Sequence, residues 1–219
     1  MVKIIGHRGA KGLAPENTLA SFKKALEYGV DAIECDVQIT ADGVFAIHHD
    51  PLVKSDKGLK FKIANYSFLE LKKHRSDLAT LDEILELVEG RSELLVEIKR
   101  KVDPSPICKR LIEYQDNGYP VKIVSFDYKT LMAVRKSFPE LRLVLNERWS
   151  GVRATWRAKR LNTKYLQMNK RYLYRSFVKM MYRRGYKLSP YTVNSPDDII
   201  TWGPYLYGVV TDRPDLFVK

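Results

Sequence analysis

Glu34 and Asp36 interrupt an otherwise apolar stretch that runs from residue 32 to residue 39. Side chains two residues apart on a β-strand share one face, so both carboxylates would point the same way. Burying two like charges side by side is costly unless a positive charge neutralises them, and hard divalent cations prefer carboxylate oxygens. We therefore predict a divalent-cation site at Glu34 and Asp36. The alternative is a surface hairpin whose acidic residues face water.

The segment after this strand brings a histidine back toward the two carboxylates. Asp42-Gly43 indicates a tight turn, and an apolar run over residues 44–47 leads from it to His49. Another histidine comes at the end of a short apolar strand near residue 4, where His7 is followed by Arg8. Two imidazoles at neighbouring strand ends can act as general base and general acid near neutral pH.

A later strand adds a third carboxylate and a second permanent cation. Glu97 and Lys99 stand two residues apart at the end of an apolar run over residues 94–98. Three carboxylates, two imidazoles and two cations around one pocket suit the hydrolysis of a phosphate ester. A bound metal ion would offset charge on the phosphoryl oxygens, and Arg8 and Lys99 would do so without a metal. The alternative for Glu97 and Lys99 is an ion pair between neighbours at a strand end.

The order of elements predicts which fold brings these residues together. Strand patterns alternate with helical patterns along the chain. We count eight strand patterns, near residues 4, 34, 96, 123, 143, 166, 190 and 209. Eight strand–helix repeats predict an α/β protein with a (β/α)8 TIM-type barrel, in which charged residues gather at the carboxyl ends of the strands. Residues 52–76 would form a small hairpin or loop insertion after the second strand. The alternative is an open, doubly wound sheet.

Composition and length are consistent with one globular domain over residues 1–219. The chain is 45% hydrophobic, and no apolar run approaches the roughly 18 residues of a membrane-spanning helix. The amino terminus has no signal-peptide pattern, so we predict a cytoplasmic protein. Cys35 and Cys108 lack metal-ligand spacing, and we expect two buried free thiols.

Positive charge is concentrated in one part of the sequence. Residues 142–187 contain fourteen lysines and arginines but one acid, Glu147, whereas the net charge of the whole chain is +12. Two sets of cations recur at helical spacing, the first at Arg153, Arg157, Arg160 and Lys164, the second at Arg175, Lys179 and Arg183. On a barrel both stripes would lie outside, away from the metal. We predict peripheral contact with an anionic membrane through this segment; the alternative is a solvated basic face.

An ordered series of short motifs resembles the glycerophosphodiester phosphodiesterase family over almost the whole chain. The motifs are His7-Arg8-Gly9, Pro15-Glu16-Asn17-Thr18, Glu34-Cys35-Asp36-Val37, Thr40-Ala41-Asp42-Gly43, His49-Asp50, Glu97-Ile98-Lys99, Tyr191-Thr192-Val193-Asn194 and Thr211-Asp212-Arg213-Pro214. The chain departs from the family at Tyr191, where a tryptophan is common, and in the compact segment after His49. Both departures bear on which alcohol leaves.

The resemblance implies a TIM-type barrel and metal-dependent hydrolysis of glycerophosphodiesters to glycerol phosphate and an alcohol. The roles carried over by position are metal binding by Glu34, Asp36 and Glu97, acid/base catalysis by His7 and His49, phosphate binding by Arg8 and Lys99, a pocket wall at Tyr191, and loop ordering by Glu16 and Asn17. The metal would be Mg²⁺ or Ca²⁺, with Mn²⁺ as a further option. His48 would face away and be structural. Water or a glycerol hydroxyl would be the nucleophile.

Two other functions stay open from the sequence. A lysophospholipase D-like enzyme would need an apolar groove at the mouth, which Phe61, Tyr66 and Phe68 could supply. A non-catalytic barrel would use its basic face to bind membrane or nucleic acid, and nucleic acid is disfavoured because all seven catalytic, metal and phosphate positions are intact. The sequence does not predict the oligomeric state.

Overall fold

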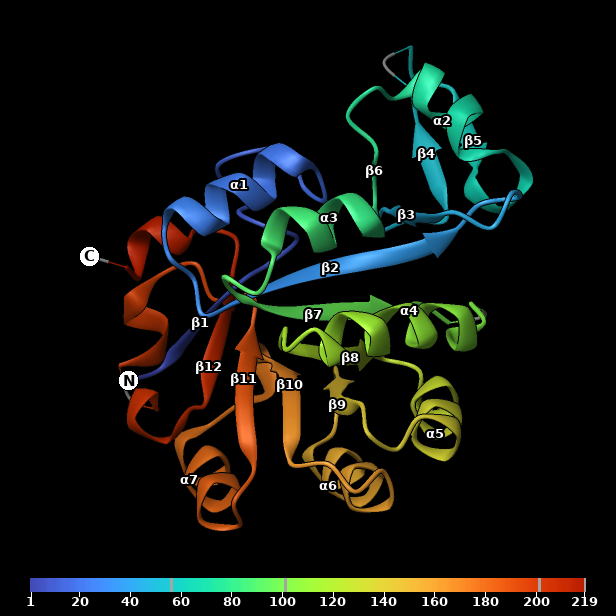
Figure 1. The fold of residues 1–219 in the computed structure, drawn as a ribbon. Helices are drawn as coiled ribbons and strands as arrows, with labels where there is room; N and C mark the ends of the chain where they lie inside the picture. The colour runs from blue at the N-terminus through green and yellow to red at the C-terminus, as the bar shows by residue number, and fades with distance from the viewer. Residues whose placement is uncertain (56, 101, 201, 219) are drawn as a thin grey trace.

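Eight parallel strands form a closed barrel in the computed structural model, which describes residues 1–55, 57–100, 102–200 and 202–218 (Figure 1). The strands are β1 (Lys3–Gly6), β2 (Ala32–Ile39), β7 (Glu93–Ile98), β8 (Val121–Ser125), β9 (Arg142–Glu147), β10 (Tyr165–Asn169), β11 (Lys187–Tyr191) and β12 (Gly208–Thr211). Their order is β11-β10-β9-β8-β7-β2-β1-β12. The ends of this series meet, because Val193 N–H donates to the Val210 carbonyl and Tyr207 N–H to the Leu188 carbonyl, both at 2.9 Å. The predicted (β/α)8 barrel is confirmed, and the open-sheet alternative is wrong.

Helices follow most strands and pack on the outside of the barrel. They are α1 (Leu19–Glu27), α3 (Leu81–Val88), α4 (Pro104–Asp116), α5 (Tyr128–Ser137), α6 (Gly151–Arg160) and α7 (Arg175–Arg183). Local capping determines where several begin: the Thr18 side chain accepts from Ser21 N–H, and Thr80 forms a reciprocal capping box with Glu83. None of the helices in the described residues is long and apolar enough to cross a bilayer.

Ser195-Pro196-Asp197-Asp198 is a helix-start signal with proline at the first helical position, yet the helix that follows it is short. Ser195 does cap, accepting from Asp197 N–H, but the described residues between β11 and β12 form two 3-10 helices, η3 (Pro196–Ile199) and η4 (Gly203–Tyr205). Gly203-Pro204 comes soon after the first turn, and proline cannot donate to a continuing helix. Another 3-10 turn, η5 (Pro214–Leu216), follows the last strand.

The insertion after β2 is a small lobe beside the barrel (Figure 1). β3 (Phe45–Ile47) pairs antiparallel with β2, and β4 (Leu52–Lys54) forms a hairpin with β5 (Lys60–Lys62). η1 (Ile63–Asn65), α2 (Phe68–His74) and the short β6 (Ala79–Thr80) complete it. The lobe has its own apolar cluster, which includes Val53, Ile63 and Leu71. The sequence predicted the Asp42-Gly43 turn and a small hairpin or loop insertion over residues 52–76, and the β4–β5 hairpin and α2 form that insertion.

Strand alternation on β2 sorts its side chains into two layers. Cys35 and Val37 pack in the layer between the sheet and the helices, whereas Ala32 belongs to a separate cluster inside the barrel. Glu34 and Asp36 share the inward parity of Ala32. Cys35 and Cys108 are buried and free, as predicted.

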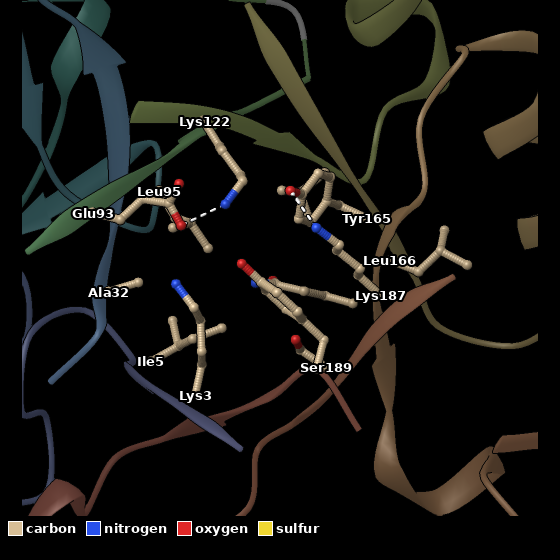
Figure 2. Close-up of a pocket in the computed structure, with 13 residues that line it drawn as sticks. Lys3, Ile5, Ala32, Glu93, Leu95, Lys122, Tyr165, Leu166, Lys187 and Ser189 are labelled. Carbon is tan, nitrogen blue, oxygen red and sulfur yellow. Dashed lines mark hydrogen bonds and ion pairs between the residues drawn. The ribbon is translucent and has the colours of Figure 1, made fainter. Parts of the chain in front are cut away.

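The amino-terminal ends of the strands are closed by lysine and tyrosine side chains (Figure 2). Lys122 is buried there, ion-pairs with Glu93 and lies 4.4 Å from the Tyr165 ring centre, while Lys187 Nζ donates to the Tyr165 hydroxyl at 3.1 Å. Burial lowers the pKa of Lys122. The cavity among these groups measures about 10 Å³, room for roughly one water. This end of the barrel is therefore a plug, and the larger clefts lie elsewhere.

Candidate active site

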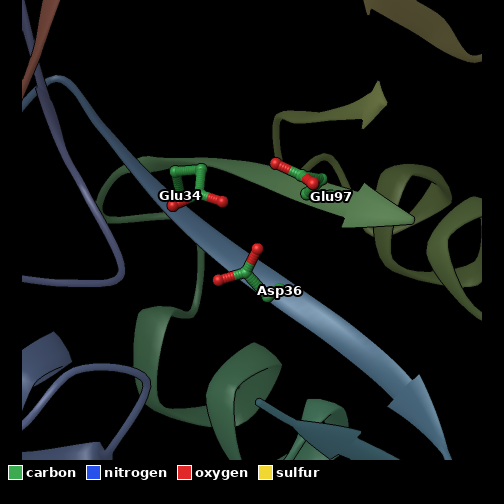
Figure 3. Close-up of side chains that lie close together, drawn as sticks. All are labelled: Glu34, Asp36 and Glu97. Atoms are coloured by element: carbon green, nitrogen blue, oxygen red, sulfur yellow. The ribbon is translucent and has the colours of Figure 1, made fainter. Parts of the chain in front are cut away.

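Three acidic side chains meet inside the barrel, toward the carboxyl ends of β2 and β7 (Figure 3). Glu34 and Asp36 come from β2, and Glu97 is the register partner of Asp36 on β7. All three are buried, with 3%, 1% and 7% of their surface exposed. One oxygen of each lies within 4.8 Å of the others. The carboxylates share one buried face, so the surface-hairpin alternative is wrong.

Lys99 and Arg8 contact this acidic cluster directly. Lys99 Nζ ion-pairs with Asp36 Oδ1 and lies 2.6 Å from Glu97 Oε1. Arg8 Nε lies 3.2 Å from Asp36 Oδ2, close enough for an ion pair but without hydrogen-bond geometry. Burial opposes ionisation of Asp36, yet Lys99 and Arg8 together hold the pKa of that carboxyl below its ordinary value. Both cations predicted to bind phosphate thus lie at the carboxylates.

The cluster fits a hard divalent cation on its charge and on its donor atoms. Burial, followed by the charges of Asp36 and Glu97, raises the pKa of Glu34 well above its ordinary value. Two cationic side chains face three carboxyl groups, so a further positive charge is needed when all three are ionised. Asn146 on β9 adds a buried carbonyl oxygen with no hydrogen-bond partner among the described residues, while its amide nitrogen lies 3.4 Å from Glu97 Oε2. An all-oxygen set of this kind suits Mg²⁺ or Ca²⁺.

His7 is held by an acidic residue from the far end of the chain. Its Nδ1 lies 2.6 Å from Asp212 Oδ1, across a sequence separation of 205 residues. Asn194 Nδ2 donates to the other oxygen of Asp212 at 2.9 Å. Burial opposes ionisation of Asp212, but the hydrogen bonds from His7 and Asn194 hold its pKa below the ordinary value. Asp212 therefore fixes the His7 ring, and Nε2 is the nitrogen left to exchange a proton.

His49 lines the same cleft as His7, Glu34 and Glu97, a cleft of about 360 Å³. Its Nδ1 lies 2.7 Å from Asp50 Oδ1. Burial, reinforced by the positive charge of Lys99, lowers the pKa of His49, so the neutral imidazole is favoured near pH 7. His48 lines neither this cleft nor the adjoining one, and its Nδ1 lies 2.8 Å from the Asp50 carbonyl. The structure thus separates the two adjacent histidines as predicted.

The loop after β1 positions Arg8 through Glu16 and Asn17. Arg8 Nη1 donates to Glu16 Oε1 at 2.7 Å, and Asn17 Nδ2 donates to Asp36 Oδ2 at 2.8 Å. Arg8 and Asn17 both have positive φ, 52° and 57°. Gly9, with φ 85°, has no room for a Cβ, which would lie 2.3 Å from Ser21 Oγ on α1. Glu16 and Asn17 thus contact the predicted site residues Arg8 and Asp36.

Aromatic side chains form one wall of the cleft. The Tyr191 hydroxyl donates to the Glu147 carbonyl at 3.1 Å, and its ring meets Phe126 edge-on at 5.8 Å. Arg148 stacks over Phe126, 4.8 Å from the ring centre. Trp149 also lines the cleft and is 62% exposed. Tyr191 was predicted at this wall; Phe126 and Arg148 were missed, because nothing in their local sequence marks them.

Comparison with known proteins identifies the family. The profile of the Glycerophosphoryl diester phosphodiesterase family matches residues 7–216. The chain belongs to this family. The resemblance drawn from the motifs is confirmed, and so is the predicted enzyme class, a phosphoric diester hydrolase of the glycerophosphodiester phosphodiesterase type.

Curated relatives match the phosphodiesterase along its whole length. A glycerophosphodiester phosphodiesterase of Bacillus altitudinis is 29% identical over 241 residues, which cover 100% of this chain and 98% of the relative. One from Caldanaerobacter subterraneus is 29% identical over 236 residues, with 99% and 96% covered.

Solved structures share the barrel fold. A glycerophosphodiester phosphodiesterase from Thermotoga maritima superposes with a TM-score of 0.85 at 25% identity, covering 99% of this chain and 97% of that one. A phosphodiesterase from Oleispira antarctica, solved in complex with the product sn-glycerol-3-phosphate, has a TM-score of 0.84 at 24% identity, with 97% and 93% covered.

Sequence reasoning missed two polar residues at the site of this phosphodiesterase. Asp212 lies directly after β12 and Asn146 near the end of β9, the positions where a barrel collects its functional side chains. The Thr211-Asp212-Arg213-Pro214 motif served only to recognise the last strand. The rule used for Glu97, a polar residue at a strand end, would have found both.

Proposed function

We propose that this protein hydrolyses glycerophosphodiesters to glycerol phosphate and an alcohol, with a divalent cation and with His7 and His49 as the acid/base pair. One observation carries the proposal: three buried carboxylates cluster together, and two of them, Glu34 and Glu97, line a single cleft with two histidines, each of which has its own carboxylate partner. The product reported with the Oleispira antarctica phosphodiesterase supports the same product class here.

Glu34, Asp36 and Glu97 would hold the cation, either Mg²⁺ or Ca²⁺, with Mn²⁺ as a third option. A bound divalent cation withdraws negative charge from phosphoryl oxygens during ester cleavage. Arg8 and Lys99 lie beside the same carboxylates and would hold the phosphate by charge-assisted hydrogen bonds. Tyr191 and Phe126 would exclude water from one side of the substrate.

The two histidines suit different halves of the proton transfer. His49 favours the neutral form, so we assign it as the base that takes a proton from the attacking oxygen. His7, held through Nδ1 by Asp212, would deliver a proton from Nε2 to the leaving alcohol. The attacking oxygen belongs to water or to a glycerol hydroxyl, and a cyclic glycerol phosphate intermediate would identify the hydroxyl route.

Metal removal tests the reaction directly. Glycerol phosphate release from glycerophosphocholine and glycerophosphoethanolamine should stop in EDTA and return with Mg²⁺, Ca²⁺ or Mn²⁺, because the acidic cluster supplies oxygen ligands for hard cations. An enzymatic assay for glycerol phosphate measures it. Full activity in EDTA after exhaustive dialysis would contradict the proposed metal dependence.

Asp212 is proposed as a positioning residue for His7, and Asp212→Asn should lower kcat about 10²-fold with little change in KM. The amide keeps the size of the side chain but offers His7 a different hydrogen-bond pattern, so the imidazole loses its ordered proton position. The matched control is Asp215→Asn, because Asp215 pairs with Arg213 in the 3-10 turn η5 and does not line the cleft. Equal losses in both variants would contradict the assignment.

The predicted stripe of basic residues on α6 needs correction. Lys164 is not on the helix, which ends at Arg160, and Arg153 turns inward to the carboxylate of Glu147, with Nε 2.8 Å from Oε2. Arg157 lies 3.6 Å from the same carboxylate, and Arg160 stacks over Trp156. Glu147 is buried at the carboxyl end of β9, so this stripe partly serves the barrel rather than an outside partner.

The second stripe, on α7, supports the proposal of peripheral contact with an anionic membrane. Arg175, Lys179 and Arg183 lie on α7, and none of them has an ion-pair partner among the described residues. Sedimentation with vesicles containing anionic lipid should therefore exceed sedimentation with neutral vesicles at low salt, and Lys179→Glu should weaken it. Equal partitioning into both kinds of vesicle would refute the contact.

The cytoplasmic location and a single functional domain over residues 1–219 stay predictions.

A further inference from the structure

An apolar groove lies next to the catalytic cleft and shares Trp149 with it. It measures about 460 Å³ and runs between the first turn of α6 and the segment that leads into α7. Its lining residues are Trp149, Ser150, Gly151, Val152, Arg171, Tyr172, Tyr174 and Phe177. A substrate held at the acidic cluster could therefore extend from the cleft into the groove past one indole ring.

The groove is built by close packing. A Cβ on Gly151 would lie 2.4 Å from a ring atom of Phe177, so glycine lets that ring lie against the start of α6 as the floor. Trp149 and Tyr172 meet edge-on at 5.5 Å, and Tyr174 contacts Phe177 with ring centres 5.9 Å apart. These contacts hold the aromatic walls in place without an occupant.

The walls leave much apolar surface in water. Val152 is 83% exposed, Tyr174 63% and Trp149 62%, and they line one groove rather than being scattered over the surface. A contiguous exposed apolar patch of this kind marks a binding site in soluble proteins. The predicted groove residues do not form it: Phe68 is buried, and Phe61 stacks on His74 within the insertion lobe.

The charges around the groove argue against a cationic occupant. Among the described residues, those that line the groove include no carboxylate, and Arg171 is the one charged side chain. The nearest acid in the α6 segment, Glu147, is already neutralised by Arg153 and Arg157. Aromatic rings without a nearby carboxylate, beside an arginine, suit an uncharged chain better than a quaternary ammonium head group.

We propose that this groove is a subsite for an uncharged apolar chain carried by the phosphodiester substrate. The chain is either an acyl group on the glycerol or the alkyl part of the leaving alcohol; both present the same methylene surface to the rings. The proposal rests on the phosphodiesterase activity assigned to the adjacent cleft. Each methylene that the groove removes from water should improve binding about threefold to fourfold.

Three water-soluble substrates separate the two sources of the chain. They are glycerophosphocholine, 1-hexanoyl-lysophosphatidylcholine and the hexyl ester of glycerol phosphate, each assayed below its micelle concentration. At least one chain-bearing substrate should exceed glycerophosphocholine in kcat/KM by about 10-fold or more, and the one that does identifies the arm that enters the groove. No advantage for either chain would overturn the proposal.

Val152→Asp tests the groove itself. Val152 is exposed in the first turn of α6, where a carboxylate is compatible with the helix, and it does not line the catalytic cleft. The variant should lose about fivefold or more of the preference for the chain while kcat/KM for glycerophosphocholine stays within about twofold. Met132→Asp on the outer helix α5 is the matched control and should change neither value. An equal loss with all three substrates would overturn the subsite.

Failure of the subsite and failure of the enzymatic assignment give different results. If none of the three substrates is cleaved, the phosphodiesterase proposal fails, and hexyl phosphate binding by calorimetry tests the groove alone. Hexyl phosphate should bind the wild type about 10-fold more tightly than glycerol phosphate does, and Val152→Asp should remove that difference. If Val152→Asp instead weakens only the sedimentation with anionic vesicles, the groove is a membrane contact and the chain subsite is refuted.

Discussion

Replacing His49 by alanine should lower kcat/KM for glycerophosphocholine by about 10³-fold. His49 lines the cleft with Glu34 and Glu97, and its lowered pKa keeps the imidazole neutral and able to accept a proton. Alanine leaves no group there that can take the proton from the attacking oxygen. Steady-state kinetics at saturating Mg²⁺ measures the effect, and thermal unfolding checks that the fold survives.

His48→Ala is the matched control, one residue away on the same segment. His48 does not line the cleft, so kcat/KM should stay within about threefold of the wild type. A large loss in His48→Ala together with unchanged melting would mean that the two histidines have been assigned the wrong way round.

The proposed role of His49 as the base also predicts the acid limb of the pH profile of kcat/KM. Protonation of His49 removes the base, so kcat/KM should fall as pH drops through the pKa of His49. Burial and Lys99 lower that pKa, and the acid limb should therefore lie below the ordinary imidazole value of about 6.5. Lys99→Met removes a nearby positive charge, so the acid limb of the residual activity of this variant should lie at higher pH than in the wild type. An acid limb above pH 7 in the wild type would contradict the role of His49.

Glu34→Gln should abolish metal-dependent activity, with a loss of about 10³-fold or more, while leaving the metal-free protein at least as stable as the wild type. Burial and the charges of Asp36 and Glu97 raise the pKa of Glu34 in the folded state. A carboxyl group with a raised pKa holds its proton more tightly when folded, so its contribution to stability is lost as pH rises through its pKa. Glutamine cannot ionise, so the variant avoids this loss of stability, but it also lacks the carboxylate that would bind the metal.

Thermal unfolding with and without metal distinguishes these effects. In EDTA at pH 7, Glu34→Gln should melt at or above the wild-type temperature. Added Mn²⁺ or Mg²⁺ should raise the melting temperature of the wild type but not of the variant.

Glu147→Gln provides the opposite control. Glu147 is a buried glutamate held by Arg153, and it does not belong to the acidic cluster. Glu147→Gln should melt at a lower temperature than the wild type, and added metal should still raise its melting temperature. A normal metal response in Glu34→Gln would refute Glu34 as a ligand.

Local sequence patterns were sufficient to place the barrel strands and most helices. Alternation on β2 put Glu34 and Asp36 on one face, and the side chains of Thr18 and Thr80, each three residues before the N–H it accepts from, begin α1 and α3. Strand periodicity and helix capping depend on residues within a few positions of each other, so a single sequence carries them in full. The helix-start signal at Ser195 leads only to a 3-10 helix, because Gly203-Pro204 lies a few residues further on.

Contacts between distant segments could not be predicted from local sequence patterns. The pairing of His7 with Asp212 depends on β12 lying beside β1, which follows only from closure of the barrel. Asn146 reaches Glu97 across β8, because β9 and β7 both turn a polar residue inward near their carboxyl ends while the inward residue of β8 there is Val124.

The residue types at each strand end are written in the sequence, and they define the class of chemistry: oxygen ligands, two imidazoles and two cations. The partner that each of these side chains contacts depends on how the barrel closes. It assigned Asp212 to His7, used Arg153 and Arg157 to neutralise Glu147, and gathered Trp149, Val152 and Tyr174 into a groove. The reason is physical: side-chain direction along a strand is set by local backbone geometry, whereas neighbours across the barrel are set by strand order and register.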